Sequence, residues 1–180
     1  PVIALSCNII VVSGNCINYI RAGNLNHKIL IPYLAGSIPL AFIGGSLPIE
    51  KHLFQFALFL VLSAAGILLL LKFKSYDDNE TSYRKIPIPF SIIIGGFLGF
   101  ISGVVGIGGG IFLSPILFLT RAGRPKHIVT TASLFILINS ISGIIGQLTK
   151  NAVLDEIVNY WYLLIAVFIG GQLGNFLNLK

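Results

Sequence analysis

The sequence contains little charge. Only 10% of its 180 residues are Asp, Glu, Lys or Arg, whereas 55% are hydrophobic and the mean hydropathy is +0.91. A soluble domain of this length needs a charged, solvated exterior, so the composition excludes an ordinary soluble protein. The apolar residues also occur in blocks of about 20, the length that crosses roughly 30 Å of hydrocarbon. We therefore predict an all-α polytopic membrane protein, a bundle of transmembrane helices.

Methionine is absent, and there are only two cysteines. Because the chain begins at Pro1 without an initiator, we expect a fragment or a processed product. Residues 1–20 contain neither a basic segment nor a cleavage site, so they do not have the pattern of a signal peptide. Cys7 and Cys16 lie nine residues apart in one apolar block. This spacing places them on roughly opposite helix faces, which favours small core residues over a disulfide or a metal site.

The apolar blocks also lack ionisable groups. Between Pro1 and Lys72 the only acidic residue is Glu50, which lies in a predicted loop. The intramembrane carboxylates expected of a proton pump or an aspartyl protease are therefore missing. HExxH and GxSxG motifs are absent as well. The histidines each follow or precede a lysine in a loop and are interpreted as solvated: His27, His52 and His127. We predict no enzyme activity, metal or cofactor.

What is present is a series of apolar segments on both sides of one polar loop. The segments lie at about residues 1–20, 29–47, 53–71, 86–120, 128–148 and 160–177, and the polar loop, predicted to be cytoplasmic, at 72–85. Ser6 and Ser13 match Ser133 and Ser140 at a constant offset of 127 residues. Such internal similarity is common in transporters. We predict a first repeat at 1–71 without its glycine-rich first helix, and a second at 86–180 without its last helix.

The segment 86–120 is too long for a single crossing, because a continuous helix of this length would measure about 50 Å. If it crosses once, the lysines and arginines divide seven to five between the two sides. If it turns back at its glycines, they divide ten to two. The positive-inside rule favours the second arrangement, a re-entrant segment, which would make the two repeats inverted. The same rule accounts for the net charge of +6, so no nucleic-acid partner is predicted.

The strongest local signal is the glycine-rich stretch at 95–110. It is not a Walker loop, because no Lys-Ser or Lys-Thr follows the glycines. One interpretation is helix packing, since small residues recur every four positions at Gly95, Gly99 and Gly103, and again at Ser102, Gly106 and Gly110. The other is an anion site. Three consecutive glycines at 108–110 favour an unwound backbone, and a half-helix starting near Ile111 would point free N–H groups at a bound anion.

The next apolar segment carries small polar residues, at Thr130, Thr131, Ser133, Asn139, Ser140, Ser142 and Gln147. Ser133 and Ser140 are seven residues apart and share a helix face, as do Ser6 and Ser13. Hydroxyls of this kind can line an anion path without placing a charge in lipid. They can equally donate hydrogen bonds between neighbouring helices.

With these motifs the sequence resembles the TauE/SafE family of sulfite exporters. The resembling residues are the glycine-rich stretch 99–110 with Pro115, the segment Thr131-Ala132-Ser133-Leu134, and the segment 19–25 before a glycine-ended span. The resemblance implies a bacterial-type inner-membrane permease for sulfite, sulfonates or related small organic anions. The family's glycine motif corresponds to Gly106, Gly108, Gly109, Gly110 and Pro115, and its Ala-Ser pair to Ala132 and Ser133.

We therefore predict a secondary transporter for a small anion, multi-pass in the cell (inner) membrane, with the lipid bilayer and the anion as partners. A homo-oligomer is left open. The expected substrate-binding residues are Gly106, Gly108, Gly109, Gly110, Pro115, Ser133, Ser140, Ser6 and Ser13. The alternative is a membrane scaffold or assembly subunit that transports nothing and uses its glycines for packing alone. The sequence does not specify the substrate, the coupling ion or the direction of transport.

Overall fold

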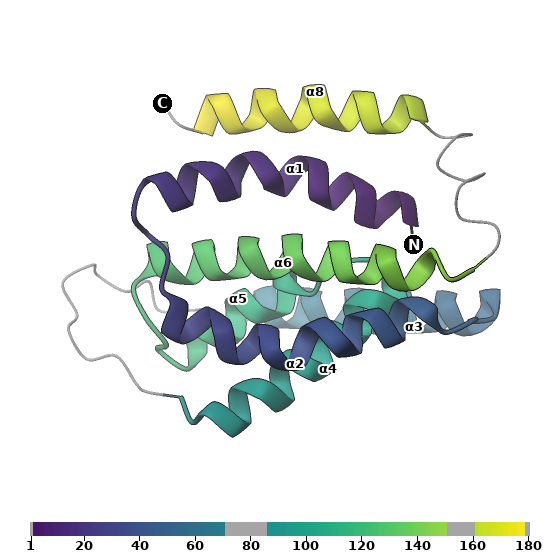
Figure 1. The fold of residues 1–180 in the computed structure, drawn as a ribbon, viewed down its shortest axis with the longest axis horizontal. Helices are drawn as coiled ribbons and strands as arrows, with labels where there is room; N and C mark the ends of the chain where they lie inside the picture. The colour runs from purple at the N-terminus through teal and green to yellow at the C-terminus, as the bar shows by residue number, and fades with distance from the viewer. Residues whose placement is uncertain (1, 71–85, 151–160, 179–180) are drawn as a thin grey trace.

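A computed structural model describes residues 2–70, 86–150 and 161–178. Within these ranges every regular element is an α-helix (Figure 1). The helices are α1 (Val2–Arg21), α2 (His27–Ser46), α3 (Lys51–Leu70), α4 (Ile88–Val105), α5 (Gly110–Leu119), α6 (Pro125–Gln147) and α8 (Trp161–Asn178). The predicted all-α fold is confirmed. The polar loop at 72–85 lies outside the described residues.

Four of these helices, α1, α2, α4 and α6, are long and apolar enough to cross a membrane. Large apolar side chains also point outward, with Phe59 65% and Ile93 70% exposed. Water would not stabilise such a surface, whereas a lipid environment would. The predicted multi-pass membrane protein is thus supported by helix length and by the apolar exterior.

The centre of the bundle is formed by α2, α4 and α6, which run in the same direction. Along α2 and α4 the close contacts advance together, from Tyr33 against Gly95 to Ala41 against Gly103. Between α2 and α6 they advance from Ile38, whose carbonyl accepts a 2.7 Å hydrogen bond from the Ser142 hydroxyl, to Phe42 against Gly146. All three helices therefore begin at the same end of the bundle.

Glycine makes the α2–α4 contact possible. A Cβ atom added at Gly95, Gly99 or Gly103 would overlap backbone carbonyl oxygens of α2, and one added at Gly36 or Gly44 would overlap those of α4. The two backbones therefore touch directly, as small-residue faces allow in membrane helices. The packing interpretation of the four-residue glycine spacing is confirmed for residues 95–103.

Two pairs of helices run in opposite directions. Figure 1 shows α1 running opposite to α6, and α2 running opposite to α8. The helices α4 and α5 form a hairpin, since Ile86 before α4 and Ala122 after α5 line the same cavity. The repeat boundaries at 1–71 and 86–180, and re-entry of the hairpin into a membrane, stay predictions.

The glycine contact predicts a specific loss of stability. In Gly99→Ala the new methyl group would lie about where Ser37 now packs, so we expect the free energy of unfolding to fall by about 1–3 kcal/mol, as for other overpacked sites. The matched control is Gly66→Ala in α3, where a Cβ meets nothing within 4 Å and helix propensity favours alanine. Thermal melting in detergent measures both variants. Equal melting temperatures for the two would contradict the contact.

Candidate functional site

The helix break between α4 and α5 is built from glycines in a left-handed conformation. After Val105, Gly106 has φ 82°, and its N–H donates to the Ser102 carbonyl at 2.8 Å. Gly108 and Gly109 follow with φ 79° and 69°. Residues with a side chain pay about 1–2 kcal/mol for this conformation, so glycine fits here. The predicted unwinding is confirmed, and the second half-helix begins at Gly110, one residue before the expected Ile111.

The break leaves backbone donors without partners. The N–H of Gly110 donates to the Gly108 carbonyl at 2.9 Å. The N–H groups of Ile107, Gly108 and Gly109 donate no hydrogen bond to any residue that the structure describes. They stand at the positive end of α5, which with ten residues is about 15 Å long. Backbone amides in such turns form concave sites that suit anions.

Side chains from three helices surround these glycines. The Ser140 hydroxyl of α6 lies 3.3 Å, and the Asn8 amide nitrogen of α1 lies 3.2 Å, from the point where a Cβ of Gly108 would be. On the other side, Ser102 Cβ of α4 lies 3.4 Å from the corresponding point at Gly109. Asn8 also donates to the Gly106 carbonyl at 3.4 Å. The break is therefore a meeting point of α1, α4, α5 and α6.

Two of the surrounding hydroxyls are buried without a partner. Ser102 and Ser140 are both 0% exposed, and their Oγ atoms have no hydrogen-bond partner among the described residues. A buried unpaired hydroxyl costs about 1–3 kcal/mol, which makes it uncommon in a finished protein core. A ligand that accepts from these hydroxyls would remove that cost.

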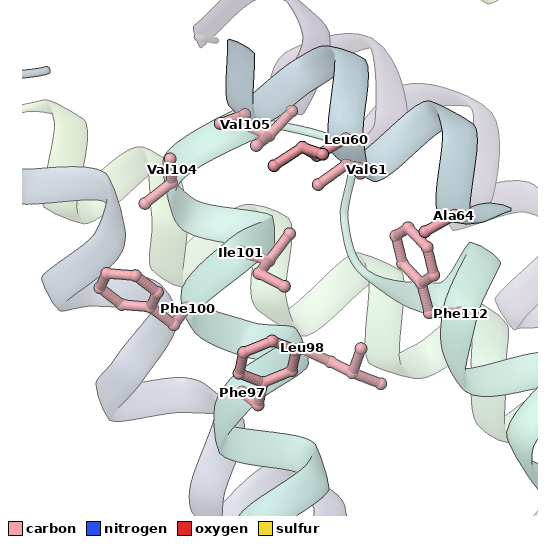
Figure 2. Close-up of a pocket in the computed structure, with 11 residues that line it drawn as sticks. Leu60, Val61, Ala64, Phe97, Leu98, Phe100, Ile101, Val104, Val105 and Phe112 are labelled. Carbon is pink, nitrogen blue, oxygen red and sulfur yellow. The ribbon is translucent and has the colours of Figure 1, made fainter. Parts of the chain in front are cut away.

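The site is closed in this structure. Ile136 and Phe135 of α6 pack directly against Gly108, Gly109 and Gly110. A cavity of about 410 Å³ is lined by residues on both sides of the break in the sequence, among them Val105 and Phe112. Figure 2 shows that apolar side chains of α3, α4 and α5 form its walls. Its walls include Leu60, Phe97 and Phe112 but none of the break glycines, and they offer no group that could hold an anion. Binding at the break therefore requires Ile136 or α5 to move.

The structure brings only some of the predicted site residues together. Gly106, Gly108, Gly109, Gly110 and Ser140 meet at the break. The remaining ones lie elsewhere. Pro115 is buried inside α5, and the Ser13 hydroxyl donates to the Ile10 carbonyl of its own helix. Ser6 and Ser133 are half-buried and are not among the nearest neighbours of Gly108–Gly110. A binding role for these four residues stays a prediction.

Two residues at the break were not identified as binding residues from the sequence. Asn8 is one of them, although an amide inside an apolar segment is a signal of a buried polar contact. The other is Ser102, for which the spacing from Gly106 and Gly110 predicts a packing face. Other polar residues of α6 do serve packing. Ser142 donates to α2, and the Gln147 amide donates to the Gly103 carbonyl at 3.5 Å.

Comparisons with known proteins give one family and several relatives. A family model described as "Sulfite exporter TauE/SafE" matches residues 1–180. A probable membrane transporter protein of Sinorhizobium fredii is 26% identical over 95% of this chain and 69% of its own length. A second from Bacillus subtilis is 24% identical over 100% of this chain and 73% of its own length. A third from Methanocaldococcus jannaschii is 31% identical over 69% of this chain and 43% of its own length. No solved structure matches the chain significantly.

The unpaired hydroxyl can be distinguished from a structural one by mutation. Ser140→Ala removes a hydroxyl that has no partner, so we expect the free energy of unfolding to stay unchanged or to rise by up to about 1 kcal/mol. Ser142→Ala removes the donor of the bond to Ile38 and should cost about 0.5–1.5 kcal/mol. Melting of both variants in detergent tests this difference. A larger loss for Ser140→Ala would show that its hydroxyl is bonded within the protein.

Proposed function

The chain belongs to the sulfite exporter TauE/SafE family, and on that premise we propose that it is a secondary transporter for small oxyanions such as sulfite or organic sulfonates, with the glycine break between α4 and α5 as its binding site. The observation that carries the proposal is the buried, unpartnered Ser140 hydroxyl beside left-handed Gly108. Membrane transport itself follows from the family and from its transporter relatives.

The donors at the break suit an oxyanion. The hydroxyls of Ser102 and Ser140 and the free amides of residues 107–109 are all neutral, so they can bind negative charge without placing a cation in the membrane. The positive end of α5 adds a favourable field at the same point. A sulfite or sulfonate group has three oxygens, and each can accept from a different member of this set. Asn8 can add a donor from α1.

The packing around the break supports alternating access. Helices α1 and α6 both contact the break and run in opposite directions, as the paired helices of an inverted-repeat transporter do. Ile136 closes the site from α6. A shift of α6 or α5 that withdraws Ile136 would expose the hydroxyls to one side of the membrane. In this proposal the anion accepts hydrogen bonds from the Ser102 and Ser140 hydroxyls, which have no acceptor in the closed protein.

The orientation and location belong to the proposal as well. In the described residues, the ends that carry Arg21, Lys28, Arg121, Arg124 and Lys126 lie together at the start of α2, α4 and α6. From the positive-inside rule we infer that this end faces the cytoplasm, and we propose the cell membrane as the location. The same charges can attract anions to the cytoplasmic mouth.

The competing function is a scaffold, which the glycine packing of α2 on α4 favours.

Anion-dependent stabilisation separates the transporter from the scaffold. We expect sulfite, or one of sulfate, taurine and sulfoacetate, to raise the melting temperature of the purified protein selectively and saturably, whereas chloride does not. A ligand at 100 times its Kd stabilises by about 2.7 kcal/mol. The shift should disappear in Gly109→Leu, which fills the break, and persist in Gly66→Ala. A protein whose melting responds to none of these anions would favour the scaffold.

Transport by reconstituted protein gives a second, independent measurement. A hydrogen bond to a charged ligand contributes about 1.5–3 kcal/mol, so Ser140→Ala should lower anion uptake into proteoliposomes by roughly tenfold or more. Its fold should remain intact, because the hydroxyl has no partner within the described protein. The control is Ser63→Ala, an exposed serine on α3 that should transport like the wild type. Equal uptake by both variants would remove Ser140 from the site.

A further inference from the structure

A second cavity, of about 670 Å³, lies far from the glycine break, at the end of the bundle where α2 and α4 begin. Its walls come from the first turns of α2, the residues around the start of α4, and Ala122 after α5. None of the residues predicted to bind the transported anion lines it. The cavity therefore needs an explanation of its own.

The deepest polar group in its wall is the hydroxyl of Tyr33. Tyr33 is 1% exposed, and its Oη atom is buried without a hydrogen bond of good geometry among the described residues, although the Ser91 side chain lies close enough to interact with it. Ser91 of α4 lines the same cavity, is 3% exposed, and bonds only weakly to the Pro87 carbonyl at 3.4 Å. An unpaired phenol at the wall of a cavity indicates a bound group that accepts its hydrogen bond.

The electrostatics of this end indicate that the group is an anion. Lys28 and His27 line the cavity. Because α2 and α4 are parallel, both helices direct their positive N-terminal ends toward it. Within the described residues the only carboxylate side chain is that of Glu50, and it lies beyond the opposite end of α2. Lys28 and the two helix N-termini thus favour negative charge at this cavity.

The rest of the cavity wall is apolar and continues onto the outer surface of the protein. Ile31 and Ile88 line the cavity and are 59% and 62% exposed. Ile29, Pro32 and Ile86 complete the apolar part. In a membrane protein, exposed isoleucines near a basic helix end face lipid close to the headgroup region. A small hydrated anion would leave this apolar surface and most of the volume unused.

We propose that this cavity binds an anionic phospholipid. The phosphate group accepts from the Tyr33 hydroxyl and pairs with Lys28, and an acyl chain lies along Ile31 and Ile88. The bound lipid would bridge the beginnings of α2 and α4, which are held together elsewhere by glycine contacts. This site is independent of the transported substrate, and it stands or falls separately from the proposed function.

The test is lipid-dependent stability of the purified, delipidated protein in nonionic detergent. We expect phosphatidylglycerol to raise the melting temperature, and phosphatidylcholine, glycerol phosphate and inorganic phosphate to have little effect. Tyr33→Phe removes only the unpaired hydroxyl, so the protein without lipid should melt as the wild type does. The phosphatidylglycerol shift should fall by at least half in Tyr33→Phe and in Lys28→Gln.

The matched controls are Tyr19→Phe and Lys126→Gln, which remove a tyrosine hydroxyl and an exposed lysine outside the cavity. Both should keep the full shift. Equal shifts with phosphatidylglycerol and phosphatidylcholine would overturn the charge recognition. An equal shift with inorganic phosphate alone would make the cavity a site for a free anion instead. Loss of the shift in the controls to the same extent would show that lipid acts through general surface charge, which also overturns the proposal.

Discussion

Direct contact between the backbones of α2 and α4 is the constraint on which the rest of this structure depends. The glycines of both helices let carbonyl oxygens approach where any Cβ would overlap them, and the contact extends from Gly36 and Gly95 to Gly44 and Gly103. In lipid there is no hydrophobic force between apolar helices, so close van der Waals packing of this kind must hold the bundle together. It also fixes α2 and α4 as a parallel pair.

Both candidate sites follow from this parallel pair. At one end the beginnings of α2 and α4 lie together, which concentrates two helix N-termini, Lys28 and His27 around one cavity. Near the other end, the four-residue glycine spacing of α4 gives way to Gly106, Gly108 and Gly109, whose left-handed conformations turn the chain back toward its starting end. The same residue type thus serves close packing in one half of the segment and an unwound backbone in the other.

Buried polar groups divide into two kinds. Ser142 and Gln147 of α6 donate to backbone carbonyls of α2 and α4, so they connect helices. The hydroxyls of Ser102, Thr131, Ser140 and Tyr33 are equally buried, but they have no partner in the described protein. Four unpaired hydroxyls are a substantial cost in a bundle that lacks a hydrophobic force between its helices. Those of Ser102 and Ser140 lie beside the helix break and that of Tyr33 lies at the cavity lined by Lys28, where a ligand can satisfy them.

The sequence by itself determined the membrane class, the helix spans and the break. Each of these depends on local properties: 20-residue apolar blocks must cross hydrocarbon, and consecutive glycines cannot continue a helix at low cost. Only the tertiary structure decided which polar residues are available to a ligand. Ser140 and Ser142 look alike in the sequence, yet one faces Gly108 and the other bonds Ile38. Asn8 reaches Gly106 across 98 positions. Hydrogen-bond satisfaction is a property of neighbours in space, and these neighbours are fixed by how the helices pack.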